Sequence, residues 1–205
     1  FSNLTPEHLD FHGDMESYFA SKLQLFKGLS TKKTAVINID DPYSDRICSA
    51  TSAKVITYGL NKDADLHPIQ SNFSLYGTKS ILQYGKAEFS INTALVGEYN
   101  LINIIAASAV SIDMGIPTRK IEQAITSIPP IPGRLEQIPC DCPGKVFIDY
   151  AHTPDAYEKL FSTIKNITNK KIITLFGCGG DRDKTKRSLM GSISEKFSDF
   201  IYITS

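Results

Sequence analysis

Apolar residues recur along the chain at two spacings, and each spacing predicts one kind of element. Where they recur every three or four positions we expect helices, at residues 14–26, 44–50, 101–112, 119–127, 154–167 and 188–197. Short apolar runs bounded by turn-forming residues predict strands, at residues 34–39, 54–58, 73–76, 80–84, 87–91, 135–138, 145–149, 172–176 and 200–204. The opening stretch 1–12, bracketed by Pro6 and Gly13, and the polar stretch 61–71 are expected to be loops.

The order of these elements predicts an α/β fold in two domains. Residues 34–58 make a βαβ unit, and the short strands after them, separated by glycine turns, predict an antiparallel meander. The proline-dense stretch Ile128–Gly133 is a stiff linker by composition, so we place the domains at residues 1–130 and 131–205. Strands and helices alternate in the second domain, which predicts a parallel, Rossmann-like sheet that lacks its later strands.

A basic, glycine-rich segment follows the apolar run 172–176. Glycine allows positive φ and a close approach of ligand to backbone, and α/β proteins bind anions where such a loop enters a helix. No Gly-Lys-Ser or Gly-Lys-Thr occurs there, so the segment is not a Walker A loop. A tight turn with a solvated charged face is the alternative. The cations of the segment are Arg182, Lys184, Lys186 and Arg187.

Composition excludes several classes of protein. The 205 residues carry 22 basic and 22 acidic side chains, which argues against a general binder of nucleic acid or of membrane surfaces. The sequence contains no run long and apolar enough for a membrane span and no secretory signal. We expect a cytoplasmic protein, which fits cysteines in the reduced state. We expect the four cysteines to be reduced, because Cys140 and Cys142 are too close in sequence for an ordinary bridge.

Several polar residues stand where ligands are usually bound. Asp149 ends a predicted strand, His152 follows it, and Arg134 lies at the domain junction. Asn100 and Asn103 open the helix at 101–112; one could be a helix cap, and the pair could read a purine edge. Together these residues predict a nucleotide-dependent enzyme whose ligand lies between the domains.

The opening stretch holds two histidines whose interpretation stays open. His8 and His12 are spaced as metal ligands on a helix are, although surface histidines are the alternative. Lys22 falls near the apolar side of the helix at 14–26, where a snorkelling surface lysine is the simpler reading.

Six motifs, in the same order along the chain, resemble those of the ATP-dependent Mur ligases. The last two motifs make the resemblance specific for the branch that adds the third residue of the peptidoglycan stem peptide. The six motifs are Asn3-Leu-Thr-Pro-Glu-His-Leu-Asp-Phe-His-Gly13 with Lys22, Ile37-Asn-Ile-Asp-Asp41, Gly97-Glu-Tyr-Asn-Leu-Ile-Asn103, Gly133-Arg-Leu-Glu136, Asp149-Tyr-Ala-His-Thr-Pro-Asp155 and Gly177-Cys-Gly-Gly-Asp-Arg-Asp-Lys184.

The resemblance implies a fold: part of a central ATP-binding domain with a small antiparallel sheet, then a truncated Rossmann-like domain that binds the amino acid. It also implies metal ligands. His8 would bind Mg²⁺, and a carbamylated Lys22, also catalytic, would bind a second Mg²⁺ through its new oxygens. No role is assigned to His12.

The remaining implied roles concern ATP and the incoming amino acid. Asn100 and Asn103 would contact adenine, and Asp149 the ribose. Arg134 and the catalytic His152 would reach the phosphates. Arg182 would bind a carboxylate of the amino acid, because its forked guanidinium matches that group.

The implied reaction is ATP-dependent amide-bond formation in peptidoglycan synthesis, and hence in cell wall biogenesis, cell shape and cell division. ATP converts the terminal carboxylate of UDP-N-acetylmuramoyl-L-alanyl-D-glutamate into an acyl phosphate, which the amino group of meso-diaminopimelate or L-lysine attacks. We expect a monomer with these small-molecule partners. A folylpolyglutamate-type synthetase and a non-catalytic nucleotide-binding module are the alternatives.

Two parts of the family pattern are missing from the sequence. The Gly-Lys-Thr phosphate loop and the uridine-nucleotide domain would precede Phe1, and a motif that helps to choose the amino acid would follow Ser205. We therefore expect a fragment of a longer enzyme that is inactive by itself.

Overall fold

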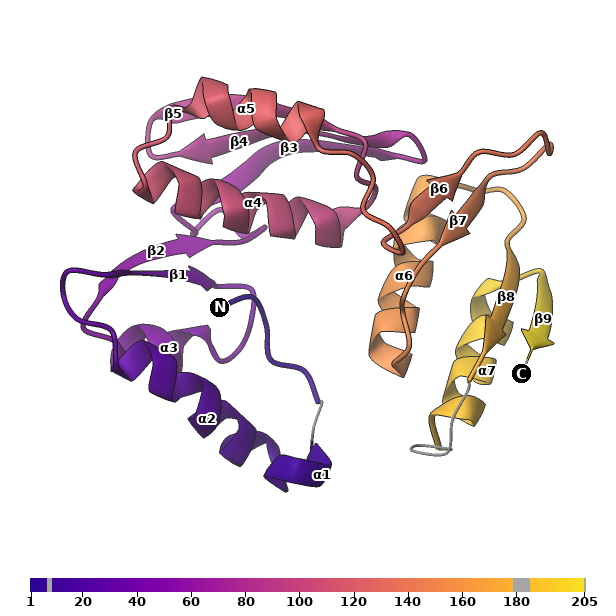
Figure 1. The fold of residues 1–205 in the computed structure, drawn as a ribbon, viewed down its shortest axis with the longest axis horizontal. Helices are drawn as coiled ribbons and strands as arrows, with labels where there is room; N and C mark the ends of the chain where they lie inside the picture. The colour runs from indigo at the N-terminus through magenta and orange to yellow at the C-terminus, as the bar shows by residue number, and fades with distance from the viewer. Residues whose placement is uncertain (7–8, 179–184, 205) are drawn as a thin grey trace. The chain divides into compact units, whose positions relative to one another are not determined.

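The computed structural model describes residues 1–6, 9–178 and 185–204 (Figure 1). The described chain forms two compact units, each with its own internal contacts. Unit 1 contains Phe1–Asn72, Thr78–Ala94 and Tyr99–Ile128, and unit 2 contains Phe73–Gly77, Leu95–Glu98 and Pro129–Ser205.

The helices of unit 1 follow the predicted spacing, with one addition. The expected loop at 1–12 is partly wrong, because Leu9–His12 forms a single helical turn. Asp14 accepts a hydrogen bond from the Ser17 N–H at 2.7 Å and caps the next helix, which was predicted at 14–26 and has Gly28 as its C-cap. The helices are α1 (Leu9–His12), α2 (Met15–Lys27), α3 (Ser44–Ala50), α4 (Glu98–Asp113) and α5 (Thr118–Ser127).

Five strands form one mixed sheet in unit 1, in the order β1-β2-β3-β4-β5. β1 and β2 pair in parallel, and β4 and β5 pair antiparallel. The expected loop at 61–71 is wrong from Leu66 onward, where β3 begins. The strands are β1 (Thr34–Asn38), β2 (Lys54–Tyr58), β3 (Leu66–Ser74), β4 (Gly77–Tyr84) and β5 (Ala87–Thr93).

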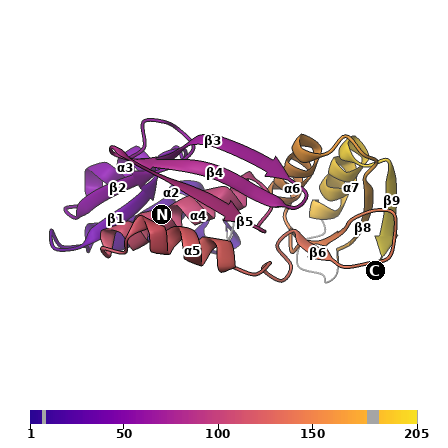
Figure 2. The ribbon, with the colours of Figure 1, turned by 90° about the horizontal axis from the view of Figure 1, so that it is seen from above.

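Helices cover the sheet of unit 1. α5 runs along β5 (Figure 2), and the Glu122 carboxylate accepts a hydrogen bond from the Ser90 N–H of that edge strand at 2.7 Å. α2 and α3 pack against β1 through a buried cluster that includes Phe19, Ile37 and Ile47. The apolar spacing noted in the sequence therefore faces this core.

The second motif, at residues 37–41, anchors the start of the chain. Asn38 donates its side-chain N–H to the Ser2 carbonyl at 2.8 Å, and the buried Asp41 accepts the Leu4 N–H at 2.8 Å. These bonds hold Ser2 and Leu4, at the start of the first motif, beside β1.

Unit 2 alternates strands and helices, which confirms the α/β fold class. α6 and α7 lie side by side (Figures 1 and 2) and enclose a core with Phe161 and Met190. The elements are β6 (Glu136–Ile138), β7 (Val146–Ile148), α6 (Pro154–Ile167), β8 (Ile173–Gly177), α7 (Thr185–Phe197) and β9 (Phe200–Thr204).

The strands of unit 2 form two separate pairs in the described residues. β8 and β9 pair in parallel, as a Rossmann-like sheet requires. β7 instead pairs antiparallel with β6, so the expectation that the strand ending at Asp149 belongs to the same parallel sheet as β8 is wrong for the described residues.

The cysteines differ from the sequence expectation. Cys140 and Cys142 form a disulfide, whereas Cys48 and Cys178 are free. The turn between β6 and β7 brings the two Cα atoms to 5.3 Å, within the range that a bridge needs despite the single intervening residue. Separately, no helix in the described ranges has the length and apolar character needed to cross a membrane.

Candidate functional site

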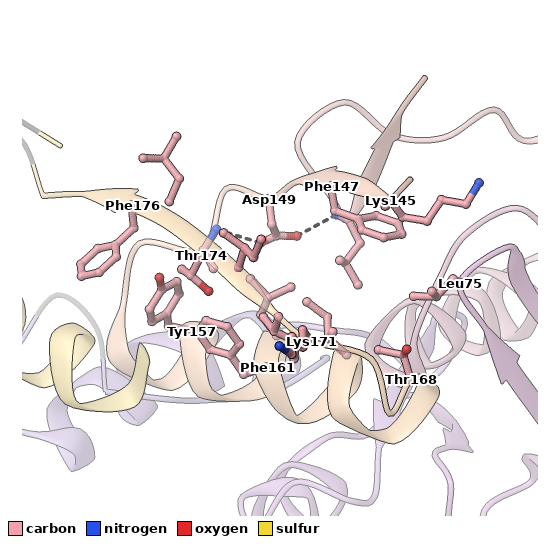
Figure 3. Close-up of a pocket in the computed structure, with 18 of the residues that line it drawn as sticks. Leu75, Lys145, Phe147, Asp149, Tyr157, Phe161, Thr168, Lys171, Thr174 and Phe176 are labelled. Atoms are coloured by element: carbon pink, nitrogen blue, oxygen red, sulfur yellow. Dashed lines mark hydrogen bonds between the residues drawn. The ribbon is translucent and has the colours of Figure 1, made fainter. Parts of the chain in front are cut away.

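The Asp149 carboxylate joins two of the motifs found in the sequence. Its Oδ2 accepts the Leu135 N–H and its Oδ1 accepts the Ala151 N–H, both at 2.8 Å (Figure 3). The antiparallel register of β6 and β7, with Glu136 opposite Ile148, brings these segments together. The motifs at 133–136 and 149–155 therefore form one local structure, which we call the β6–β7 junction.

The backbone of the junction is strained at a residue that is not glycine. Leu135 has a φ of +44°, which L-residues rarely adopt, and Gly133 nearby has a φ of +67°. The bond from the Leu135 N–H to Asp149 and the burial of the Leu135 side chain offset a strain of about 1–3 kcal/mol. Such strain is concentrated at functional sites, which supports a functional role for the junction.

Tyr150 brings two of the predicted site residues together. The Arg134 guanidinium lies 5.6 Å from the centre of the Tyr150 ring, and the His152 ring lies 5.1 Å from it. The Tyr150 N–H also donates to the Gly133 carbonyl at 2.8 Å. Arg134 and His152 are both exposed, so a ligand can reach both side chains beside Tyr150.

One nitrogen of His152 is already engaged within the chain. Its Nδ1 lies 3.1 Å from the Tyr150 carbonyl oxygen, so a proton on Nδ1 donates to that carbonyl. This arrangement leaves Nε2 for a ligand. Lys186 donates from Nζ to the His152 carbonyl at 3.3 Å and adds positive charge beside it.

A pocket of about 1070 Å³ lies within unit 2 beside Asp149 (Figure 3). Apolar and charged side chains both line it, and Tyr157 and Phe161 project into it from α6. A pocket in which polar groups converge on an apolar wall is typical of a ligand site. The charged or ionisable polar residues that line it include Asp149, His152, Lys145, Lys170, Lys171 and Lys186.

The first glycine of the glycine-rich segment, Gly177, is the last residue of β8 and has a packing role. A Cβ at Gly177 would lie 2.6 Å from the Thr204 carbonyl oxygen, so the close pairing of β8 with β9 already requires glycine. Arg182, like residues 179–184 as a whole, lies outside the described residues. The predicted role of Arg182 stays a prediction.

Lys22 lies on the exposed side of α2, next to an aromatic stack. Its Nζ is 5.3 Å from the centre of the Tyr18 ring, and the His12 ring stacks on Tyr18 at 4.8 Å. His8 lies outside the described residues. No group of three or more His, Cys, Asp and Glu residues that could hold a metal occurs in the part of the chain that the structure describes.

Asn100 and Asn103 both lie in the first turns of α4 but differ in exposure. Asn100 is buried, whereas Asn103 is exposed and can offer its amide to a ligand. Of the two, Asn103 is therefore the asparagine that a ligand can reach.

Two residues of the junction were not selected as site residues from the sequence. Tyr150 contacts both Arg134 and His152, and the Glu136 carboxylate accepts the Gly133 N–H at 2.8 Å. Both residues belong to the motifs at 133–136 and 149–155, and this was the signal in the sequence that could have identified them. The junction as a whole presents an exposed guanidinium, an exposed imidazole and a carboxylate, which suits a ligand that carries anionic groups and hydroxyls.

Two protein-family models match the chain. The model described as the Mur ligase middle domain matches residues 1–111, and that described as the Mur ligase, glutamate ligase domain matches residues 133–205.

Individual proteins with the same printed name are similar over the whole chain. The UDP-N-acetylmuramoyl-L-alanyl-D-glutamate–2,6-diaminopimelate ligases of Syntrophomonas wolfei and Solibacter usitatus are 41% and 42% identical to it. The match covers 100% of this chain and 42% of each relative, so the chain spans less than half of their length. A solved structure of a ligase with that name is 32% identical, with a TM-score of 0.73, over 100% of this chain and 42% of its own.

Proposed function

The chain belongs to the Mur ligase family, and we propose that it carries nucleotide-binding and ligation residues of an ATP-dependent enzyme. The enzyme would join a third amino acid to UDP-N-acetylmuramoyl-L-alanyl-D-glutamate. We favour 2,6-diaminopimelate over L-lysine because the two relatives are named for it. For the same reason we place this activity ahead of a folylpolyglutamate-type synthetase.

The β6–β7 junction is the observation that carries the proposal. Asp149 fixes the segment of Arg134 to that of His152, and Tyr150 contacts both side chains. We propose that Arg134 donates hydrogen bonds to the phosphates of ATP, and that His152, with protons on both ring nitrogens, donates to them from Nε2 while Nδ1 donates to the Tyr150 carbonyl. Each Asp149 oxygen accepts one backbone N–H and keeps a lone pair, with which it can accept a bond from a ribose hydroxyl.

We propose that Asn100 and Asn103 contact the adenine. An amide side chain donates and accepts at the same time, as the edge of adenine does. Asn103 is exposed and can bind the base directly, whereas the burial of Asn100 fixes its amide within the first turns of α4.

We propose that His8 and a carbamylated Lys22 hold two Mg²⁺ ions. Lys22 fits this role because it is exposed, and a carbamate would give it the oxygen ligands that Mg²⁺ prefers. The bound ions would supply positive charge to the oxygens of the transferring phosphoryl group. His8 lies outside the described residues, so its part rests on the first motif.

The proposed reaction has two steps. A carboxylate oxygen of the UDP-linked dipeptide attacks the γ-phosphorus of ATP, and ADP leaves with the bonding electron pair. Arg134 and His152 stabilise the negative charge on the phosphoryl oxygens during this transfer. The amino group of the incoming amino acid then attacks the acyl carbon, phosphate leaves, and an amide bond forms. We propose that Arg182 binds a carboxylate of that amino acid.

Isotope transfer tests this function in the full-length protein that contains the chain. The dipeptide substrate is labelled with ¹⁸O in its terminal carboxylate and incubated with ATP and diaminopimelate. We expect tripeptide product, ADP and phosphate that carries one labelled oxygen from the carboxylate. Label in AMP would contradict the acyl phosphate, and the absence of tripeptide with either diaminopimelate or lysine would contradict the ligase.

A further inference from the structure

We infer that Cys140 and Cys142 form a thiol–disulfide exchange site, which reacts with small thiols and disulfides and controls the order of the β6–β7 junction. The site is separate from the proposed ligation residues and goes beyond the proposed function. Four features support it: the exposure of the two cysteines, the burial of the other two, the short loop that the bridge closes, and the ladder that begins beside it.

Exposure makes Cys140 and Cys142 the reactive pair of the chain. Both lie exposed in the turn between β6 and β7, where small thiols can reach them. Cys48 is half-buried, and burial, with a smaller contribution from Asp45, raises the pKa of its thiol. Cys178 is half-buried with its Sγ 3.6 Å from the Met190 sulfur. Exchange should therefore be selective for the turn.

The residues around the bridge restrict the backbone of the turn. Pro139 and Pro143 flank the Cys140-Asp141-Cys142 segment and each fixes its own φ. The Cα atoms of the two cysteines are 5.3 Å apart, so the bridge can open and close without a large backbone movement.

The bridge closes too short a loop to be a general staple of the fold. A disulfide stabilises a protein chiefly by restricting the unfolded chain, and the restriction grows with the length of the closed loop. Only Asp141 lies between Cys140 and Cys142. Opening the bridge should therefore leave unit 2 folded and act on the turn itself, which is the behaviour required of a reversible site.

The β6–β7 ladder connects the turn to the junction. Its three residue pairs run from Ile138 opposite Val146, next to the turn, to Glu136 opposite Ile148, next to Asp149. Beyond that end lie the bonds from the Leu135 N–H to Asp149 and from the Tyr150 N–H to Gly133. A ladder this short depends on the order of its turn, so a looser turn should weaken those two bonds.

The exchange balances with a small disulfide as oxidant. The thiolate of one cysteine attacks a sulfur of the small disulfide, forms a mixed disulfide and releases one small thiolate. The second cysteine, as thiolate, attacks the protein sulfur of that mixed disulfide and releases the other. The protein loses two electrons and two protons, and the small disulfide becomes two thiols.

Equilibration with glutathione tests the site in the 205-residue chain. The ratio of reduced to oxidised glutathione is varied over about four orders of magnitude. At each ratio the free thiols are alkylated, and the masses of the peptides are measured by mass spectrometry. We expect the peptide that contains residues 140–142 to convert reversibly between the dithiol and the disulfide as the ratio changes. Cys48 and Cys178 should remain free thiols, and therefore be alkylated, at every ratio. A pair that stays in one state at every ratio, or glutathione carried chiefly by Cys48 or Cys178, would overturn the inference.

Single substitutions separate exchange from simple exposure. In Cys140→Ser, Cys142 has no partner and should accumulate a stable mixed disulfide with glutathione, and Cys142→Ser should do the same at Cys140. The matched control, Cys178→Ser, should leave the bridge equilibrium unchanged. Failure of both turn variants to take up glutathione would contradict the two-step exchange.

Amide hydrogen exchange tests the coupling to the junction. We expect the Leu135 and Tyr150 amides to exchange at least about threefold faster in the dithiol form. The Tyr157 amide, bonded to the Thr153 carbonyl in α6, is the internal control and should keep its rate. Equal rates at Leu135 and Tyr150 in both forms would refute control of the junction by the bridge.

Discussion

Asp149 is a single residue on which two chain segments depend. Both of its oxygens accept backbone N–H groups, from Leu135 and Ala151. In Asp149→Asn an amide NH₂ replaces one carboxylate oxygen. One of the two backbone N–H groups then faces another donor and loses its hydrogen bond. We expect the free energy of unfolding of unit 2 to fall by about 1–3 kcal/mol, measured by urea unfolding.

Asp155→Asn is the matched control for this change. Asp155 is exposed and pairs with Lys159 one helical turn away at 2.9 Å. Removal of such a surface pair should change stability by no more than about 0.5 kcal/mol. If the two variants lose the same stability, Asp149 does not hold the junction.

A substitution at Lys22 tests whether this residue serves the reaction and not the fold. It is exposed on α2, so Lys22→Ala should leave unfolding unchanged. If its carbamate serves the reaction, the same variant of the full-length protein should lose turnover, and added short carboxylates should restore part of it. Lys27→Ala, an exposed change on the same helix, should keep full turnover. Normal turnover in Lys22→Ala would remove the carbamate from the mechanism.

The cap of α2 predicts how one helix responds to acid. The hydrogen bond from the Ser17 backbone N–H, followed by that from its side chain, lowers the pKa of Asp14 below its usual value of 3.8. A carboxyl with a lowered pKa stabilises the fold above the unfolded value, and this contribution is lost as the pH falls through the folded value.

Asp14→Asn tests that contribution, since it keeps an oxygen acceptor for the cap but does not titrate. Between about pH 5 and about pH 2 we expect the variant to lose less of its free energy of unfolding than the native chain does. Urea unfolding at each pH provides the measurement. Parallel curves for the two proteins would show that Asp14 does not act as a titrating cap.

Elements with strong local signals were predictable from the sequence, and those formed by pairing alone were not. The start of α2 at Asp14 and its end at Gly28 follow from capping chemistry. Only the last two residues of β3 fall in the predicted strand at 73–76. The rest was missed because residues 69–72 are exposed and mostly polar and Pro68 lies near the start, so the segment shows neither alternation nor an apolar run. It forms because β2 and β4 lie on either side of it.

The candidate site shows the same division. Arg134, Asp149 and His152 were recognisable from their motifs, yet their contact depends on the antiparallel pairing of β6 with β7. A parallel sheet was expected, because strands and helices alternate in that part of the sequence. The bridge of Cys140 and Cys142 was missed because the spacing in sequence does not reveal how tightly a turn folds.

At the scale of the whole molecule, each unit has its own core and should respond separately to a core change. Phe161 is 2% exposed, and its ring stacks on Phe197 at 5.5 Å. Phe161→Ala should destabilise unit 2 by about 3–5 kcal/mol. Hydrogen exchange read by mass spectrometry should accelerate in α6 and α7, while β1 and β2 of unit 1 keep their rates.

Phe200→Ala is the control of matched chemistry, because Phe200 lies in the same unit but is 55% exposed. It should affect exchange in the helices of unit 2 much less. Equal acceleration in β1 and β2 after Phe161→Ala would contradict separate cores.

ADP formation by the full-length protein that contains this chain tests the central claim, that its residues serve ATP-driven ligation. We predict that ADP forms only when ATP, the UDP-linked dipeptide and the amino acid are all present. Asn103→Ala and Arg134→Ala, both changes at exposed residues, should each raise the KM for ATP by about tenfold or more without lowering the unfolding temperature. No ADP formation with the complete set of substrates, or an unchanged KM for ATP in both variants, would contradict the account.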